Sequence, residues 1–326
     1  MSFFACRTFW LVWLMLAAAA VTAARPVHAA DSGKRLALVI GNSSYQGIAP
    51  LTNPTNDAKD VAAKLKSLQF EVLLATDASQ EKMHALLQEF RAKVTRDHVA
   101  LVFYAGHGVT VNNESFLLPV DMPATLDLDE KGELGARALN LQLVSMASVL
   151  SPLEGAKLGI VFLDACRTSL SSQGLGLTVR TAAVGQGRSA RIMRGTGSLD
   201  VKPSSYSAGV FRAYATQLDN VASDGLGRNS PFTKALLQHI GTKGLSIQEL
   251  MIRVRKSVVA ETKSAQVPWE EAALNEMFYF VPAGGGPPAF GPPGGGNPAA
   301  KRTGGGVGGR PNNLPPNIGV GVGTGL

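Results

Sequence analysis

The chain has 326 residues, of which 45% are hydrophobic, so it is long enough for one large domain with a continuous core. Its formal net charge is +7, but its basic residues form no dense run interleaved with aromatic residues. Composition and charge therefore favour a globular protein and argue against a nucleic-acid partner.

The first 29 residues are predicted to be a secretory signal. Arg7 precedes a largely apolar run over residues 9–24, and small residues stand at the −3 and −1 positions of a cut after Ala29. The alternative is an uncleaved N-terminal anchor, because the apolar run is just short of a comfortable membrane span. We expect an exported protein, periplasmic or secreted, with membrane contact only if this segment is retained.

Short apolar runs alternate with helical patterns between residues 30 and 282, which we predict to form one domain. Strands are predicted at 35–41, 70–74, 99–104, 158–163, 210–216 and 277–281. Helices are predicted at 56–68, 79–94, 141–150, 231–240 and 246–262. A hairpin is predicted at 109–118. This alternation implies an α/β fold with a mostly parallel, about six-stranded sheet and helices on both faces.

The remaining segment, 283–326, consists almost entirely of Gly, Pro, Asn and small apolar residues. Such a composition buries too little side chain to offset the loss of backbone freedom. A disordered tail is therefore predicted.

Two predicted strands run into residues that can carry chemistry. Strand 99–104 is followed by His107 between two glycines, and strand 158–163 is followed by Asp164 and Cys166. Sites in parallel sheets lie at the carboxyl ends of the strands. If these strands are neighbours, the imidazole can take the proton of the thiol and generate a nucleophile. The glycines leave room for a substrate backbone, and the N–H of Gly108 is a candidate oxyanion donor.

Cysteine usage supports this interpretation of Cys166. The other cysteine, Cys6, leaves with the predicted signal, so the mature protein holds a single thiol. A lone cysteine is more often a small buried hydrophobe, and a histidine is more often a satisfied core residue. That alternative has to explain why the only mature thiol follows a strand end.

Asp164 precedes Cys166 by two residues, so both side chains share one face of the strand. A carboxylate raises the pKa of a neighbouring thiol and is a poor activator. Asp164 suits attraction of a cationic substrate side chain, and a turn cap at the strand end is an equal alternative.

The segments YAGHG (104–108) and FLDACR (162–167) resemble the paired histidine and cysteine motifs of caspase-like peptidases. They are most similar to those of metacaspases and their bacterial relatives, the orthocaspases. The resemblance covers about 34–282, and the spacing suits a signature in which the histidine lies about 50 residues upstream. Further similar segments follow in order at 38–42, 56–58, 214–216, 221–225 and 266–270. The resemblance implies a caspase-like three-layer α/β sandwich.

The resemblance also implies a mechanism and a specificity. Cys166 would attack the peptide carbonyl and His107 would protonate the leaving amine, with the N–H groups of Gly108 and Cys166 as the oxyanion hole. Cleavage would follow Arg or Lys, held by Asp57 and Asp164 through charge-assisted hydrogen bonds. Substrates would be proteins or peptides with a basic P1 residue.

No cofactor and no metal ligand are predicted, with calcium as an alternative. This chain only partly matches the acidic cluster that binds calcium in some members of the family. Its acidic residues in that region are equally explained as a solvated loop. They are Asp121, Asp127, Asp129 and Glu130.

The segment 168–205 is predicted to be a long polar loop, and such a loop inside a compact domain is functional or disordered. A peptidase that prefers basic residues would find sites for self-processing in this loop. The candidates are Arg180, Arg188, Arg191 and Arg194. The alternative is an uncleaved linker.

Two other functions fit the same residues. One is a catalytically silent caspase-fold binding or scaffold module in the cell envelope. The other is a Cys–His hydrolase or acyltransferase that acts on a non-peptide ester or amide.

Overall fold

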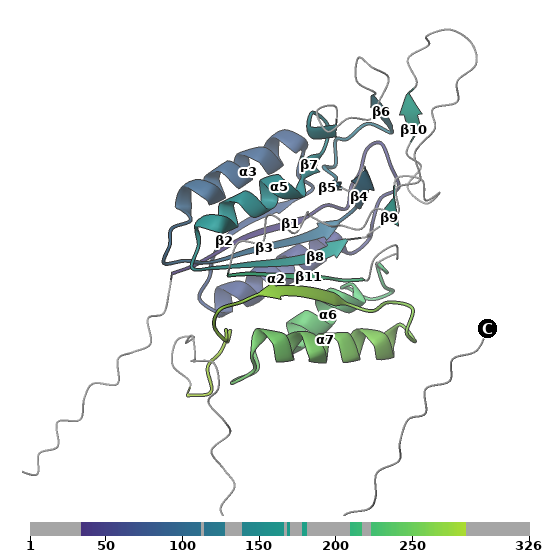
Figure 1. The fold of residues 1–326 in the computed structure, drawn as a ribbon. Coiled ribbons are helices and arrows are strands. Elements are labelled where there is room, and N and C mark those ends of the chain that lie inside the picture. Colours follow the sequence, from purple (N-terminus) through teal and green to yellow (C-terminus); the bar gives the residue numbers. More distant parts are fainter. Residues whose placement is uncertain are drawn as a thin grey trace, which may run out of the picture. The chain divides into compact units, whose positions relative to one another are not determined.

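A six-stranded sheet lies at the centre of the computed structural model, with strand order β12-β11-β8-β3-β1-β2 (Figure 1). Its strands are β1 (Arg35–Gly41), β2 (Glu71–Thr76), β3 (Val99–Gly106), β8 (Leu158–Ala165), β11 (Val210–Tyr214) and β12 (Trp269–Ala273). Neighbouring strands are parallel except for the antiparallel pair β11–β12. The predicted mostly parallel, six-stranded sheet is thereby confirmed.

The structure describes residues 34–111, 114–127, 139–165, 168–169, 178–180, 209–216 and 223–284. The predicted signal at 1–29 lies outside these residues, as does nearly all of the predicted tail. Within the described ranges, no helix combines the length and apolar character needed to cross a membrane.

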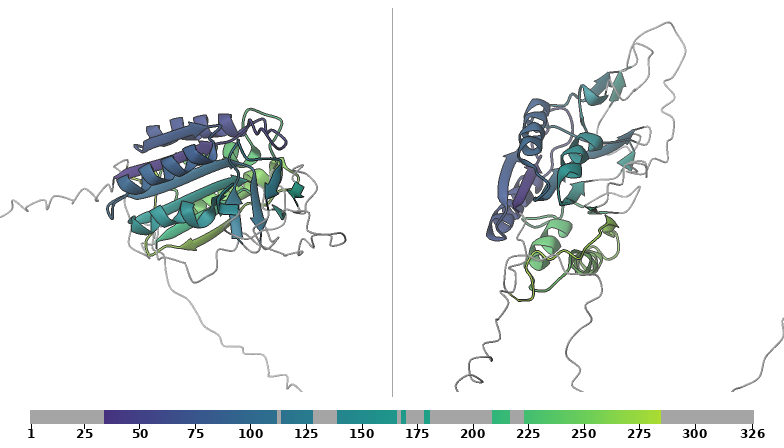
Figure 2. Two further views of the ribbon diagram at one scale, coloured as in Figure 1. Left: turned by 90° about the horizontal axis from the view of Figure 1, so that it is seen from above. Right: turned by 60° about the vertical axis from the view of Figure 1, so that its left-hand side comes forward.

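Helices cover both faces of the sheet (Figures 1 and 2). On one face lie α3 (Gln80–Lys93) and α5 (Met146–Leu150); on the other lie α2 (Pro54–Ser67), α6 (Pro231–His239) and α7 (Ile247–Glu261). Alternate residues of β1 face the two layers. Leu36, Leu38 and Ile40 join the core under α3 and α5, while Ala37 and Val39 join the core over α2, α6 and α7. Burial on both sides explains why the central strands are continuously apolar.

Capping residues set the starts of the helices. Ser79 accepts a hydrogen bond from Lys82 N at the start of α3, and Ser246 and Glu249 form a reciprocal capping box at α7. Helix α2 begins at Pro54, two residues before the predicted start at Asn56. Proline suits the first turn because its missing N–H would have no partner there.

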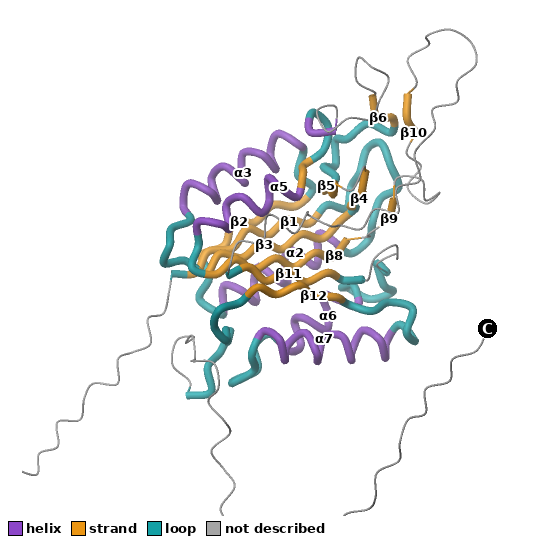
Figure 3. The backbone as a smooth tube through the Cα atoms, in the orientation of Figure 1, coloured by secondary structure: helices purple, strands orange, loops and turns teal. Residues whose placement is uncertain are grey.

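A smaller sheet extends beyond the main one, with order β7-β5-β4-β9 (Figure 3). It contains β7 (Val144–Ser145), β5 (Glu114–Leu117), β4 (Gly108–Val111) and β9 (Thr168–Ser169). The antiparallel β4–β5 pair confirms the predicted hairpin. A separate parallel pair joins β6 (Thr125–Asp127) to β10 (Thr178–Arg180). The prediction of a plain loop over 168–205 was therefore wrong at β9 and β10, because strands this short carry no hydrophobic period.

Two other predicted elements differ from the structure. Only Met146–Leu150 of the predicted helix 141–150 forms α5, because Val144–Ser145 pairs with β5 instead; the helix is followed by the 3-10 helix η2 (Ser151–Gly155). The predicted last strand, 277–281, is not part of the sheet, and the half-exposed segment β12 takes that place. Phe278 and Phe280 are apolar because they pack into the core beside α6 and α7. An edge strand needs only one ladder of hydrogen bonds, so hydrophobicity does not mark it.

Candidate active site

The strand ends that carry the predicted dyad are neighbours. In the parallel β3–β8 ladder, Gly106 pairs with Ala165, and His107 is the next residue after β3. Beyond the strand ends, Val109 of β4 pairs with Thr168 of β9. Cys166 lies outside the described residues, but Ala165 directly before it is paired with Gly106, and Thr168, two residues after it, is paired with Val109.

The imidazole of His107 is fixed by a backbone carbonyl. The side chain is 95% buried, since only 5% of its surface is exposed, and Nε2 lies 2.9 Å from the oxygen of Ala49. A carbonyl oxygen only accepts, so Nε2 carries the proton of the neutral ring and Nδ1 holds the free lone pair. Nδ1 is buried and has no hydrogen-bond partner among the described residues. Burial lowers the pKa of His107, against smaller raising effects of Ala49 and Asp224. The ring is thus a neutral base whose free nitrogen is Nδ1.

Two tyrosines hold the backbone of His107. The Tyr45 hydroxyl accepts from His107 N at 2.7 Å, and its ring lies 4.7 Å from the imidazole, centroid to centroid. The Tyr104 hydroxyl donates to His107 O at 2.8 Å. Gly106 has φ +151°, and a Cβ there would lie 2.6 Å from the Tyr45 hydroxyl. The absence of a side chain at this glycine leaves room for the two tyrosine hydroxyls. The sequence alone indicated only room for a substrate backbone.

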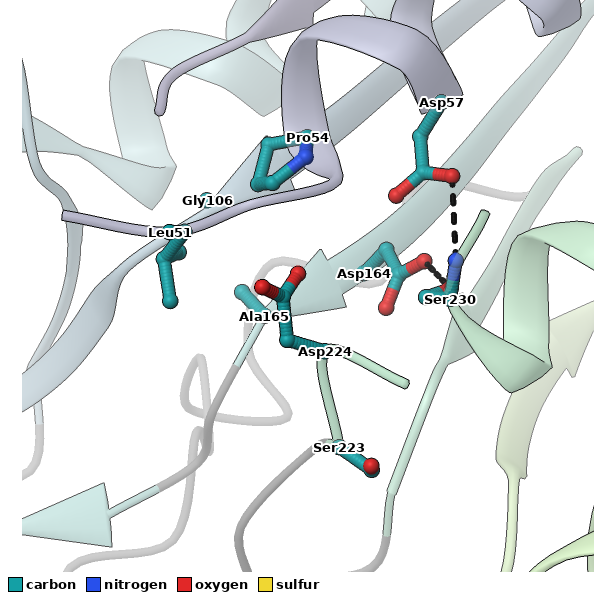
Figure 4. A pocket seen from close by; sticks show the side chains of 9 residues that line it. All are labelled: Leu51, Pro54, Asp57, Gly106, Asp164, Ala165, Ser223, Asp224 and Ser230. Carbon is teal, nitrogen blue, oxygen red and sulfur yellow. Dashed lines mark hydrogen bonds between the residues drawn. The ribbon is translucent and has the colours of Figure 1, made fainter. Parts of the chain in front are cut away.

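Three carboxylates from three elements line one cavity (Figure 4). Asp57 comes from α2, Asp164 from β8, and Asp224 from the segment that precedes α6. Asp57 and Asp164 are 1% and 7% exposed. The structure thus brings together the two predicted pocket residues and adds Asp224. Asp224 belongs to a segment noted for its resemblance, but no local pattern marks it as a pocket residue.

Ser230 joins the two buried aspartates (Figure 4). Its N–H donates to Asp57 Oδ1 at 3.1 Å, and its hydroxyl donates to Asp164 Oδ2. Thr233 Oγ1 also donates to Asp164 Oδ2, at 2.6 Å, and Asn229 Nδ2 donates to Asp57 Oδ1 at 3.0 Å. Ser230 is the N-cap of α6, so the positive end of a helix dipole lies beside these carboxylates.

The buried aspartates hold protons more strongly than exposed ones do. Burial, reinforced by the charge of Asp164, raises the pKa of Asp57 to about 8. Burial, reinforced by the charge of Asp224, raises the pKa of Asp164 to about 6, although the hydroxyls of Ser230 and Thr233 oppose the shift. Like charges in a desolvated pocket disfavour full ionisation unless a cation enters. The electrostatics of the cavity therefore suit a cationic group.

The other predicted site residues are distributed as follows. Gly108 is the buried first residue of β4 and pairs with Leu117. Arg180 is the last residue of β10. The processing candidates Arg188, Arg191 and Arg194 lie outside the described residues.

Of the acids considered for calcium, Asp121 has a structural contact. Its Oδ1 accepts from Gln80 N at 2.9 Å, at the start of α3. Asp129 and Glu130 lie outside the described residues, and the side chain of Asp127 is not described. In the part of the chain that is described, no group of three or more His, Cys, Asp or Glu side chains is placed to hold a metal ion.

Comparison with known proteins identifies a protein family whose profile matches most of the chain. The profile of the caspase domain matches residues 34–279. Mucosa-associated lymphoid tissue lymphoma translocation protein 1 of Homo sapiens is 33% identical over 89 residues, which are 27% of this chain and 11% of that protein. Its Mus musculus homolog is 34% identical over 89 residues, again 11% of the relative's length. The match thus spans about a tenth of these curated relatives.

A solved structure has a similar fold. Caspase-1 from Spodoptera frugiperda superposes with a TM-score of 0.53 and covers 78% of this chain and 92% of its own. The sequence identity is 17%, so this likeness concerns the fold.

Proposed function

This chain belongs to the caspase domain family and is a caspase-like cysteine peptidase, and from that premise we propose that it is an endopeptidase that cuts after arginine or lysine. One observation carries the proposal. Ala165, directly before Cys166, is paired with Gly106, directly before His107, and Thr168 is paired with Val109 shortly after them, at the end of the sheet where the acidic cavity lies. A nucleophile, a base and a cation pocket then share one end of the sheet.

In the proposed mechanism, Nδ1 of His107 takes the proton of the Cys166 thiol. The thiolate attacks the scissile carbonyl, and the N–H groups of Gly108 and Cys166 receive the developing oxyanion. When the tetrahedral intermediate collapses, the C–N bond breaks and His107 gives its proton to the leaving amine. Water then attacks the thioester, His107 takes the water proton, and the released thiolate recovers it. The Ala49 carbonyl supports this cycle because it keeps the proton of Nε2 in place.

The proposed specificity comes from Asp57 and Asp164. A guanidinium presents several N–H donors in one plane and suits two carboxylates on one wall. A lysine ammonium would be attracted as a point charge by the same two carboxylates. The metacaspases that this chain resembles commonly carry a serine two residues before the histidine, where this chain has Ala105. One neutral pocket contact is therefore missing, while the two carboxylates are kept.

The test is a thiol-reactive peptide probe with arginine at P1, compared with the same probe carrying aspartate at P1. We expect the arginine probe to label Cys166 faster, and Cys166→Ala to remain unlabelled. Equal labelling by both probes would favour a non-peptide Cys–His enzyme. A folded protein that neither probe labels would be a silent binding module, and the peptidase proposal would be wrong.

We extend the proposal to export, with cleavage after Ala29, and to self-processing in the segment 168–205. Export rests on the sequence of the first 29 residues. Mass analysis of the protein recovered from the cell envelope and the medium tests it, since retention of residues 1–29 would support the anchor instead.

A further inference from the structure

One short segment touches both halves of the proposed site. The Ala49 carbonyl fixes Nε2 of His107, and Leu51, two residues later, lines the acidic cavity. Residues 49–52 form neither helix nor strand, and Ala49, Pro50 and Thr52 are exposed. The orientation of the histidine therefore depends on whatever holds this segment in place.

Asp224 holds the segment from the pocket side. Its Oδ2 accepts from Thr52 N at 2.6 Å, and its Oδ1 accepts from Asn53 N at 3.2 Å. The side chain of Asn53 donates back to the carbonyl of Asp224. On the other side, Leu51 N donates to Ser43 O at 3.0 Å. Figure 4 shows the Asp224 carboxylate pointing toward Leu51 and Pro54, across the cavity from Asp57.

Asp224 is itself anchored to the frame of the fold. Ser223 N donates to Gln266 Oε1 at 3.1 Å, and Gln266 Nε2 donates to Ala215 O at 2.8 Å, directly after β11. Gln266 is 1% exposed, so this anchor is shielded from water. Displacements of the carboxylate are consequently transmitted to the Thr52–Asn53 backbone.

The same carboxylate faces the cavity that a basic side chain would enter. An ionised carboxylate has about four lone-pair sites, and the two backbone N–H groups use two of them. The remaining sites are able to accept from a guanidinium without releasing the segment. A bound cation would then draw Asp224, Leu51 and the Ala49 carbonyl into one ordered wall.

We propose that Asp224 is a positioning residue that couples occupancy of the basic-residue pocket to the orientation of His107. The inference rests on the proposed function, since it assumes that His107 acts on Cys166. A substrate without a basic P1 residue would then lose binding and also leave the histidine less well ordered.

The first test uses alkylation of Cys166 by iodoacetamide, a small uncharged reagent that does not need the pocket. The rate is followed by mass mapping of the Cys166 peptide in the full chain. Asp224→Asn keeps the shape of the side chain but replaces one acceptor by an NH₂ group, so one backbone bond is lost. We expect alkylation to slow about tenfold. Asp60→Asn is the matched control, because Asp60 binds Arg228 and Asn229 of the same loop outside the cavity lining. Its alkylation rate should equal that of the wild type.

The second test fills the pocket of the wild type with ethylguanidinium, a small cation that carries the guanidinium of an arginine side chain but no peptide bond. At a concentration that inhibits hydrolysis of an arginine peptide by half, we expect Cys166 alkylation to accelerate at least threefold. Asp224→Asn should lose this acceleration. This arm stands even if the variant does not fold, since the wild type alone decides it.

The outcomes separate this inference from the proposed function. If arginine peptides are cut but ethylguanidinium leaves wild-type alkylation unchanged or slows it, the coupling is wrong and the peptidase stands. If folded Asp224→Asn is alkylated as fast as the wild type, Asp224 serves the pocket alone and the coupling is again wrong. If the wild type neither cuts arginine peptides nor reacts with iodoacetamide faster than the denatured chain does, the proposed function itself fails.

Discussion

At the residue scale, the chemistry of the site follows from a few buried polar groups with fixed partners. The Ala49 carbonyl sets the tautomer of His107, and Tyr45 and Tyr104 fix its backbone. Ser230 presents its N–H and its hydroxyl to two different carboxylates. Apart from Tyr104, which is three residues from His107, these partners lie far from their targets in sequence, so their contacts depend on the fold being complete.

The buried carboxylate of Asp57 lowers the stability of the folded protein at high pH, although in the proposed function its charge is needed to bind a basic substrate. Its pKa in the folded protein is raised from 3.8 to about 8, so between these values the folded state binds more protons than the unfolded state. Stability attributable to this group is therefore present at low pH and is lost as pH rises toward 8. We expect Asp57→Asn to raise the melting temperature at pH 8 more than at pH 5.

The same substitution should weaken binding of arginine substrates. The loss of one charge-assisted bond predicts a fall in kcat/KM of about 10- to 150-fold, or roughly 1.5–3 kcal/mol, and Asp164→Asn should act alike. Asp60 is the control for the stability prediction. Its pKa is lowered by its hydrogen bond with Arg228, so Asp60→Asn should not raise the melting temperature at pH 8. Wild-type kcat/KM in both pocket variants would refute the pocket assignment.

At the scale of elements, the sequence predicts what is periodic or capped and misses what depends on packing. The apolar runs at β1, β3, β8 and β11 and the Ser79 cap of α3 are local signals, and the structure confirms them. Strand β12 is polar and half-exposed, so only its ladder with β11 reveals it.

The residues of the candidate site were likewise predicted only in part. His107, Asp57 and Asp164 were identified from strand ends and from resemblance. The roles of Ala49 and Asp224 were not predicted. Both residues lie in irregular segments without a hydrophobic period, and any residue type can supply the backbone carbonyl that Ala49 uses. Their roles emerge only when segments 49–53 and 223–230 lie together, as the hydrogen bonds of Asp224 show.

The end of β3 should tolerate no side chain at position 106. Gly106 has φ +151°, and an added Cβ would lie 2.6 and 2.7 Å from the hydroxyls of Tyr45 and Tyr104. We expect Gly106→Ala to lower the free energy of unfolding by about 2–4 kcal/mol, measured by urea titration. Gly155→Ala is the control, because an added Cβ there meets no atom within 4 Å. Equal stability of the two variants would contradict the packing described for Gly106.

The segment between β8 and β11 should be the place of self-processing. Arg180 ends β10, whose backbone is already paired with β6 and is therefore less available to bind as a substrate than an unpaired segment would be. We therefore expect cuts after Arg188, Arg191 or Arg194. Intact mass over time should show these cuts in the wild type and none in Cys166→Ala. The same fragments in both proteins would identify a contaminating protease.

At the scale of the whole molecule, the three-layer arrangement gathers the proposed chemistry at one edge. The carboxyl ends of β3 and β8, the start of α2 and the segment before α6 meet there, although they are distant in sequence (Figure 1). The layers supply a rigid frame, because the central strands are buried on both faces. The segments that contact His107 and the cavity are irregular pieces fixed to this frame.

The central claim is tested most directly by hydrolysis of four fluorogenic peptides that differ only at P1, with Arg, Lys, Ala or Asp. The account predicts cleavage of the Arg and Lys peptides, at least about 100-fold lower kcat/KM for Ala and Asp, and no activity in folded Cys166→Ala. Cleavage that is indifferent to the P1 residue, or full activity without Cys166, would contradict it.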